Sequence, residues 1–289
     1  MKGSTSERLR RGITTFFLVF FFLYMFAPLI YMMIAAFNSS RIPSVIPWRS
    51  FTTDWFPVMW NDQRMWQGLR SSALIGVCVI LLSVPIGLAG AFLITRFRVP
   101  GKSLIYGVLV APVLMPGVII GLSTLIFWDT RFHIGGRWGL SVLGQTSFIA
   151  AYCMLIFMAR LQRFDSTLEE AALDLGATPR QAFWTVTVPF LRPAILSASA
   201  LAFFQSFENY NTTLFTIGND LTFTMYIAGR VRAGVTPAVN ALACVMILLT
   251  IAGGVVYELL RRRDQRIAER RQRAAEQAET VLPSLHAAR

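Results

Sequence analysis

Residues 168–195 read L-E-E-A-A-L-D-L-G-A-T-P-R-Q-A-F-W-T-V-T-V-P-F-L-R-P-A-I, a polar interruption between apolar runs. Glu170 begins a short helix-forming run, and Glu169 and Glu170 fall in its first turn, where the helix dipole favours negative charge. Gly176 ends the run, because glycine adopts a left-handed turn at no steric cost. The first half of this stretch therefore predicts a short acidic helix that is closed by a glycine turn.

A second helix is predicted directly after the turn. Thr178 can cap it, and Pro179 occupies its first position, where a missing N–H costs nothing. We expect Pro189 and Pro193 to end this helix. Its apolar face would be formed by Phe183, Trp184 and Val186. A helix, a glycine turn and a second helix between two membrane spans form a shape that suits docking of another protein.

These residues resemble the EAA loop of permeases from binding-protein-dependent ABC importers, whose pattern is E-A-A-x-x-x-G followed by a later L-P pair. Glu170-Ala171-Ala172 and Gly176 match it, and Val188 stands in place of the leucine before Pro189. The flanking segments that resemble the spermidine/putrescine-type branch are Arg163-Phe164-Asp165 and Asp174-Leu175-Gly176-Ala177. The alternative is an ordinary amphipathic cytoplasmic loop.

The composition is that of a membrane protein. Hydrophobic residues make up 55% of the 289 residues and charged residues 15%. The apolar residues occur in runs long enough to cross a bilayer, which takes about 20 residues as helix. Cys78, Cys153 and Cys244 lie inside such runs without metal-ligand spacing, so we expect them to be buried apolar side chains.

The apolar runs predict an all-α, six-span helical bundle, the architecture of type I (MetI-like) importer permeases that the resemblance also implies. The first run is interpreted as an uncleaved span, because a signal peptide has a shorter apolar core. The six spans are expected near residues 13–36, 70–94, 103–127, 140–160, 192–215 and 237–260.

The basic residues predict the orientation of the chain. Of its 27 Lys and Arg residues, 19 would lie on the side of the two termini and 8 on the other side. The positive-inside rule places a short N-terminus (1–12) and a basic tail (261–289) in the cytoplasm, on either side of a permease domain (13–260). The net charge of +12 is thus a topology signal, and no nucleic-acid partner is expected.

Prolines and small residues predict where the spans bend and pack. Pro85 in the second span, and Pro112 and Pro116 in the third, free backbone groups that neighbouring helices or water must satisfy, so we expect kinks. Gly117 and Gly121 form a G-x-x-x-G pair, which permits close contact.

The fifth span contains an acid. Counted along the helix from Arg192, Glu208 lies roughly 24 Å into the membrane. An acid inside a span is costly and should face a bundle interior or a wet cavity. The substrate pathway is therefore predicted at Glu208, Asn209, Tyr210 and Asn211. The alternative is a structural acid paired with Arg230 or Arg232.

Two further segments have more ordinary interpretations. The external residues 38–69 are rich in tryptophan, which favours the membrane interface, although a surface for a soluble binding protein is an alternative. The segment 261–279 predicts a solvated helix whose arginines meet anionic membrane lipid.

The motifs of nucleotide and metal chemistry are absent from the sequence. It contains no G-x-x-x-x-G-K-[ST] and no H-E-x-x-H, and its two histidines are His133 and His286. We therefore predict no catalytic residue and no metal site in this chain, and no cofactor of its own. ATP and Mg²⁺ are expected on a partner ATPase.

The resemblance implies a transport machine in a bacterial inner membrane. Its other parts would be a cytoplasmic ABC ATPase dimer, a second homologous permease subunit and a periplasmic solute-binding protein. Residues 161–191, the coupling loop, would seat in a groove of the ATPase, with Phe183 and Trp184 anchoring it to the spans. The residues expected to couple the two are Glu170, Ala171, Ala172, Asp174, Gly176, Ala177, Phe183 and Pro189.

The expected solute is a polyamine such as spermidine or putrescine. Polyamine members of the family often carry acids where Glu208 is followed here by Asn209, which leaves one charge in place of two. The same type of importer for a phosphonate, an opine, an amino-acid derivative or a metal ion is therefore an alternative. A secondary carrier that uses Glu208 as an ion site is a further one, whereas an integral-membrane enzyme lacks a catalytic constellation.

Overall fold

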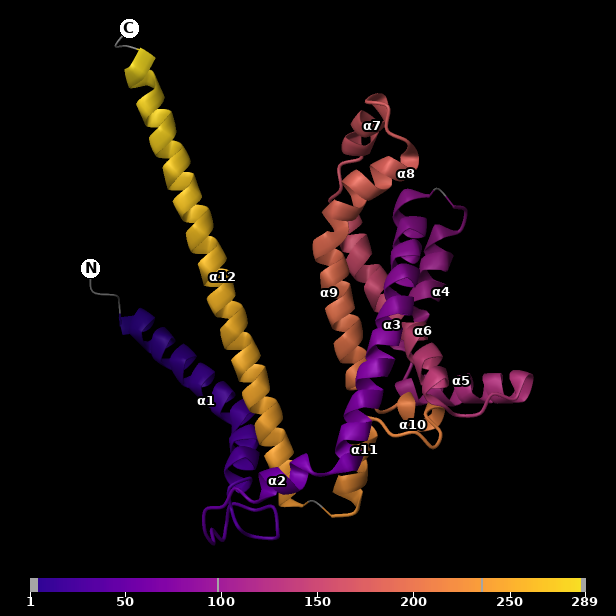
Figure 1. Cartoon of the computed structure of the whole chain (residues 1–289), viewed down its shortest axis with the longest axis vertical. Coiled ribbons are helices and arrows are strands. Elements are labelled where there is room, and N and C mark those ends of the chain that lie inside the picture. Colours follow the sequence, from indigo (N-terminus) through magenta and orange to yellow (C-terminus); the bar gives the residue numbers. More distant parts are fainter. Residues whose placement is uncertain (1–4, 98, 235, 287–289) are drawn as a thin grey trace. The chain divides into compact units, whose positions relative to one another are not determined.

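The computed structural model describes residues 5–97, 99–234 and 236–286 (Figure 1). All regular elements in this part of the chain are helices, and Asn38 and Phe51 form one isolated antiparallel bridge. The first four residues of the predicted N-terminus, Arg98, Val235 and the last three residues of the predicted tail lie outside the described residues. The chain divides into two compact units, residues 1–61 with 234–289, and residues 62–233.

The first unit consists of three helices. They are α1 (Thr5–Ala35), α2 (Trp55–Trp60) and α12 (Pro237–His286), and α12 packs against both of the others. Most of α1 is exposed, which suits a helix whose apolar side chains face lipid or another subunit. The predicted tail is helical, since α12 continues through it, but its side chains beyond residue 265 are not described.

The loop between α1 and α2 folds around the buried side chain of Asn38. The Asn38 amide nitrogen donates to the carbonyls of Ser44 and Pro47, and its oxygen accepts the Arg49 N–H. The Trp55 indole N–H donates to the Asn38 carbonyl at 2.9 Å. These bonds satisfy a polar group that burial would otherwise penalise, and the tryptophan content of the loop did not predict them.

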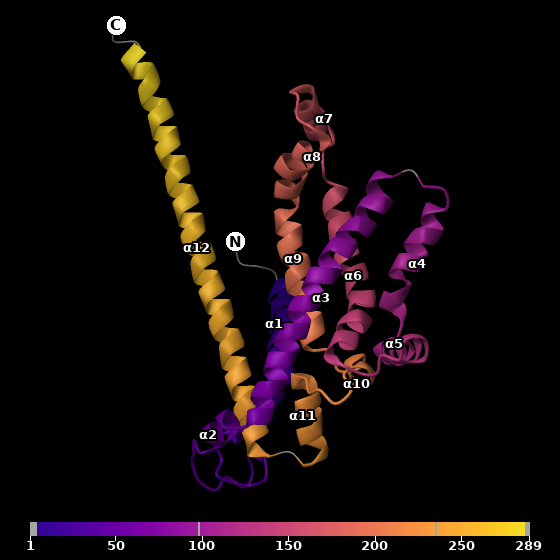
Figure 2. The ribbon, with the colours of Figure 1, turned by 45° about the vertical axis from the view of Figure 1, so that its right-hand side comes forward.

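The second unit contains the remaining helices. At its centre α3 (Gln63–Arg96), α6 (Trp138–Leu161) and α9 (Val188–Phe207) run side by side (Figures 1 and 2). Their contact faces form an apolar core that includes Ile75, Ile149, Phe157 and Leu191. The other elements are α4 (Lys102–Leu114), α5 (Gly117–Phe132), α7 (Thr167–Asp174), α8 (Pro179–Ala182), the π-helical turn η1 (Phe183–Thr187), α10 (Thr213–Thr216) and α11 (Phe223–Arg232).

The second and third spans, in which proline kinks were expected, behave differently. Pro85 lies inside α3, which continues as one helix to Arg96. The third predicted span is broken instead, because α4 and α5 meet at an angle of 103°. Met115 and Pro116 both have extended backbone there, as expected where a proline disfavours helix for the residue before it.

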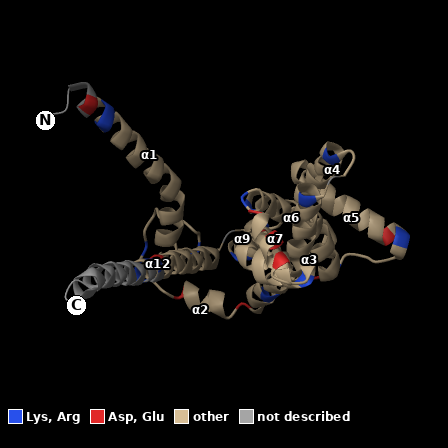
Figure 3. Ribbon diagram, turned by 90° about the horizontal axis from the view of Figure 1, so that it is seen from above, with Lys and Arg blue, Asp and Glu red and all other residues tan. Residues whose placement is uncertain are grey.

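The expectation of six spans is met with two corrections of detail. Within the described part, five helices are long and apolar enough to cross a membrane, and the bent pair α4–α5 makes a sixth if it counts as one crossing. The fifth predicted span (192–215) is displaced, since the apolar helix runs from Pro179 to Phe207. Figure 3 shows charged residues at α7 and at the far end of α5, while most of the remaining ribbon of this unit is uncharged.

Candidate functional site

Helix α7 and its turn form as the sequence predicts. Glu169 and Glu170 lie in the first turn of α7, and Gly176 has a φ of +87°. No atom lies within 4 Å of the position that a Cβ on Gly176 would occupy, so backbone conformation, not space, requires glycine. The N–H groups of Gly176 and of the next residue donate to the carbonyls of Leu173 and Ala172, which closes α7 as a Schellman motif.

The start of the second helix is also as predicted. The Gln181 N–H donates to the Thr178 hydroxyl oxygen at 3.3 Å, and the Thr178 N–H donates to the Gln181 side-chain oxygen at 2.8 Å. With Pro179 at the first position, these bonds form a capping box. The two short helices are thus held by local turn chemistry that can be read from the sequence.

The prediction that Pro189 and Pro193 end this helix is wrong. Helix α8 continues through η1 directly into α9, with Pro189 in the first turn of α9 and Pro193 inside it. In η1 the Val188 N–H donates to the Phe183 carbonyl, five residues earlier. The wider turn lets the helix restart at its first turn, where a proline needs no N–H partner.

The outer surface of the coupling loop is acidic and apolar. Glu170 is exposed, and so are Leu168, Leu173 and Leu175, the last with 90% of its surface accessible. Exposed leucines beside an acid are typical of a surface that another protein covers. The predicted coupling residues 170–177 all belong to this segment.

The two aromatic residues expected to anchor the loop differ in position. The Phe183 ring lies 5.9 Å from the ring of Phe92 in α3, measured between centroids, so it contacts the bundle as predicted. Trp184 is 59% exposed and touches Phe183 edge-on. The expectation that Trp184 anchors the loop is therefore not met, since the helix turns this side chain outward.

Sequence reasoning missed the residue that ties α7 to the bundle, Glu169. Its carboxylate accepts from Arg96 Nη1 at 2.7 Å and from the hydroxyl of the fully buried Thr187. No sequence pattern distinguishes Glu169 from Glu170, because both occupy the first turn of the same helix.

The predicted pathway residues come together at the opposite end of the bundle from α7 (Figure 2). A cavity of about 380 Å³, the Glu208 cavity, is lined by Glu208, Asn209, Tyr210 and Asn211. Its other walls are the break between α4 and α5 and the inner faces of α6 and α9, from which come Pro112, Val113, Met115, Gly117, Ile120, Phe148, Tyr152 and Gln205. The bend in the third span, which the sequence placed only approximately, therefore forms part of this cavity.

Glu208 lies at the end of α9 and not within a span, because the helix stops at Phe207. The side chain of Asn209 starts the next turn by accepting the N–H groups of Thr212 and Thr213 at 3.1 and 3.3 Å. The carboxylate of Glu208 is exposed, and the described residues include no ion-pair partner for it. It is therefore available to a ligand in the cavity.

The glycine pair Gly117 and Gly121 lets α5 approach the chain after α9. A Cβ on Gly121 would lie 2.6 Å from the Thr212 carbonyl oxygen, and one on Gly117 would lie 3.2 Å from the Asn211 Cβ. The G-x-x-x-G prediction of close contact is confirmed, although its partner is a short polar segment and not another long helix.

A buried polar network that the sequence did not predict supports this segment. The Gln145 amide nitrogen donates to the Thr213 hydroxyl at 2.9 Å, and its oxygen accepts from the Ser206 hydroxyl at 2.6 Å. Ser141 and Thr216 share a further bond at 2.9 Å. These bonds hold α10 on α6 and so fix one side of the Glu208 cavity.

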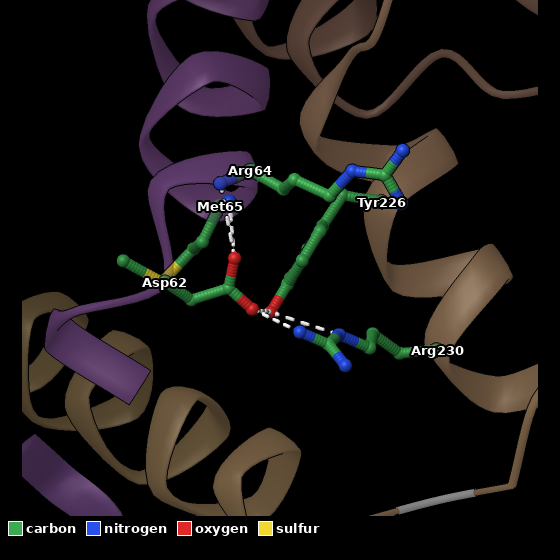
Figure 4. Close-up of polar contacts among 5 residues, drawn as sticks. All are labelled: Asp62, Arg64, Met65, Tyr226 and Arg230. Atoms are coloured by element: carbon green, nitrogen blue, oxygen red, sulfur yellow. Dashed lines mark hydrogen bonds and ion pairs between the residues drawn. The ribbon is translucent and has the colours of Figure 1, made fainter. Parts of the chain in front are cut away.

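Arg230 and Arg232 have other partners than Glu208, so the structural-acid alternative is wrong. Arg230 pairs with Asp62, which also accepts from the Tyr226 hydroxyl at 2.8 Å (Figure 4). Arg232 donates to the Tyr210 hydroxyl at 2.7 Å. Helix α11 is thereby held both to the start of α3 and to the wall of the Glu208 cavity.

Asp62 is the centre of this contact. Its other carboxylate oxygen accepts the N–H groups of Arg64 and Met65 and so caps α3 (Figure 4). Burial acts to raise the pKa of Asp62, but the hydrogen bonds from Tyr226, Arg230 and Met65 outweigh it and hold the pKa below its ordinary value. The carboxylate is therefore charged at neutral pH, as its pairing requires.

Known proteins resemble this chain over most of its length. Residues 1–265 match the family described as binding-protein-dependent transport system inner membrane component. The putrescine transport system permease protein PotI of Escherichia coli K12 is 33% identical over 257 residues, which cover 86% of this chain and 91% of PotI. The spermidine/putrescine transport system permease protein PotC of the same organism is 28% identical over 247 residues, which cover 85% of this chain and 92% of PotC.

Solved structures show the same fold. A chain of a bacterial ABC transporter for import of the acidic polysaccharide alginate aligns with a TM-score of 0.63 at 15% identity. The alignment covers 91% of this chain and 99% of the transporter chain. A chain of an amino acid ABC transporter has a TM-score of 0.53 at 19% identity, with 74% and 100% covered. The chain belongs to the family of binding-protein-dependent transport system inner membrane components, and is a multi-pass permease subunit of an ABC importer.

Proposed function

We propose that this permease subunit moves a small polyamine such as putrescine from a periplasmic binding protein across the membrane. The observation that carries the solute proposal is the carboxylate of Glu208, which has no ion-pair partner among the described residues and lines a cavity. The names of the relatives PotI and PotC support the same solute class.

The lining of the Glu208 cavity suits an alkyl-ammonium ion. A carboxylate provides one charge-assisted hydrogen bond, and aromatic faces attract cations. Phe148, Tyr152 and Tyr210 provide such rings beside Glu208. One acid can hold one ammonium group, so the second ammonium of a diamine would be met by ring faces or by the companion permease subunit.

The coupling loop is proposed to dock on a cytoplasmic ABC ATPase, which would bind ATP and Mg²⁺ and perform the hydrolysis. Glu170 and the exposed leucines of α7 and its turn would form the contact. Closure of the ATPase pair would then move the loop and rock the packed helices between inward- and outward-facing arrangements. The loop end of the bundle would be cytoplasmic, together with both termini, and the α10–α11 end periplasmic.

Reconstitution tests this proposal. The chain is placed in proteoliposomes with its companion permease, the ATPase and the binding protein, and uptake of radiolabelled putrescine is measured with and without ATP. We expect ATP-dependent uptake that Glu208→Gln lowers, because the amide cannot neutralise an ammonium, while the ATPase still co-purifies.

Asp129→Asn serves as a matched control, since it removes an exposed carboxylate of α5 that does not line the Glu208 cavity, and it should retain uptake. Full uptake by Glu208→Gln would remove this residue from the pathway. Uptake that follows a proton gradient and needs no ATPase would replace the importer with a secondary carrier.

A further inference from the structure

The two adjacent acids of α7 have different surroundings. The Glu169 side chain is 23% exposed, and its two carboxylate oxygens bind two different partners, Arg96 at the end of α3 and Thr187 at the start of α9. Glu170 is exposed, and its carboxylate forms no hydrogen bond or ion pair within the described residues. One acid therefore faces the bundle, and the other is free for a protein partner.

The Arg96 side of this contact continues into a stack of charged and aromatic groups. The Arg96 guanidinium lies 4.8 Å from the centre of the Phe164 ring, which meets Phe190 edge-on at 4.9 Å. The Arg160 guanidinium lies 4.0 Å over Phe190 and donates to its carbonyl at 3.1 and 3.2 Å. The stack joins the inner ends of α3, α6 and α9, so a force on Arg96 reaches all three helices of the core.

The second partner of Glu169, Thr187, lies in the turn that joins the coupling loop to α9. Thr187 is fully buried and belongs to η1, whose wider turns precede α9. Turns of this kind recur at functional sites in helices. Glu169 therefore holds the last residue of η1 and the last residue of α3 with one carboxylate.

No other side chain of α7 makes a polar link to the membrane helices in the described part of the chain. Without Glu169, α7 would be joined to the bundle by the chain on either side of it and by apolar contact alone. A short helix that lacks a polar link to the membrane helices can tilt without moving them, so a movement of the ATPase would be transmitted less completely.

We propose that Glu169 is the positioning residue of energy coupling: it fastens the coupling loop to α3 and α9, while Glu170 serves the contact with the ATPase. This inference rests on the proposed function of the loop. It assigns different tasks to two neighbouring acids, and it places the transmission of movement at Arg96, Glu169 and Thr187.

The test uses the complete transporter in proteoliposomes with radiolabelled putrescine, and measures both ATPase co-purification and putrescine moved per ATP hydrolysed. Glu169→Gln should retain the ATPase but lower the transport ratio by at least about fivefold, the lower end of typical coupling between sites. Glu170→Gln should instead weaken ATPase retention.

Two threonines of η1 provide a matched pair. Thr187→Val removes the hydroxyl that binds Glu169, whereas Thr185→Val removes one that binds the Gln181 carbonyl of its own helix at 2.8 Å. We expect the transport ratio to fall for Thr187→Val and to stay at the wild-type value for Thr185→Val. This pair also carries the test if Glu169→Gln fails to insert.

Three results would overturn the assignment. A wild-type transport ratio in Glu169→Gln with the ATPase retained would show that the link transmits nothing. Equal transport ratios in the two threonine variants would show that Thr187 is not part of the coupling link. Loss of the ATPase from Glu169→Gln would show that Glu169 is a docking residue. Failure of the wild-type chain to retain any ATPase would instead refute the proposed function itself.

Discussion

Replacing Gly87 with alanine should separate the two helices at the centre of the second unit. A Cβ on Gly87 would lie 2.6 Å from the Cys153 Cβ, 2.7 Å from the Ala150 carbonyl oxygen and 2.8 Å from the Met154 nitrogen. Two of these atoms belong to the backbone of α6, and neither can rotate away. Helices α3 and α6 must therefore move apart at Gly87.

Two effects of opposite sign determine how much Gly87→Ala changes the free energy of unfolding. Overpacking a close contact costs about 1–3 kcal/mol, and the backbone neighbours place this site towards the upper end. Exchanging glycine for alanine inside a helix returns about 1 kcal/mol. We expect a net loss of about 1–2 kcal/mol, which lowers the unfolding temperature of a unit of this size by about 3–6 °C.

The assay is thermal unfolding of the purified protein in detergent, with two glycines of the same unit as controls. A Cβ on Gly90 would meet the sulfur of the flexible Met154 side chain at 3.0 Å, and one on Gly107 would meet nothing within 4 Å. Alanine at Gly90 should cost little, and alanine at Gly107 should be neutral or stabilising. If Gly87→Ala unfolds at the same temperature as Gly107→Ala, the tight α3–α6 crossing is refuted.

Further predictions concern the turn at Gly176, the carboxylate of Asp62 and the membrane topology. Gly176→Pro forces φ to about −65° where the turn needs a positive angle, so ATPase co-purification should disappear while membrane insertion persists; retained co-purification would reject docking by this turn. Although burial acts to raise the pKa of Asp62, its hydrogen bonds hold it below the ordinary value of 3.8, so its contribution to stability is present above that value and is lost as the pH falls further. The unfolding temperature should therefore fall more steeply between neutral pH and about pH 3 for the wild type than for Asp62→Asn. Parallel curves of unfolding temperature against pH would contradict this. A cysteine at position 174 should be protected from an impermeant external thiol reagent and one at position 54 should react, whereas the reverse would invert the proposed topology.

Local chemistry explains what could be predicted. The turn at Gly176 and the cap at Thr178 depend on residues within a few positions of each other, and both form as expected. The apolar runs likewise located the long helices, because burial in a bilayer imposes the same requirement along the whole of a run. The ends of α9 were predicted at the wrong residues. A π-helical turn before α9 accommodates Pro189, and after Phe207 the Asn209 side chain starts a new turn by accepting backbone N–H groups.

The family, the membrane-spanning helices and the turn at Gly176 could be predicted because each is encoded in neighbouring residues. Which charged side chains pair depends on how the helices pack. Asp62 pairs with Arg230, 168 residues later, and Glu169 with Arg96, 73 residues earlier. Side chains so far apart in the chain are brought together by the packing of the core helices. The local sequence around each residue therefore does not predict its partner.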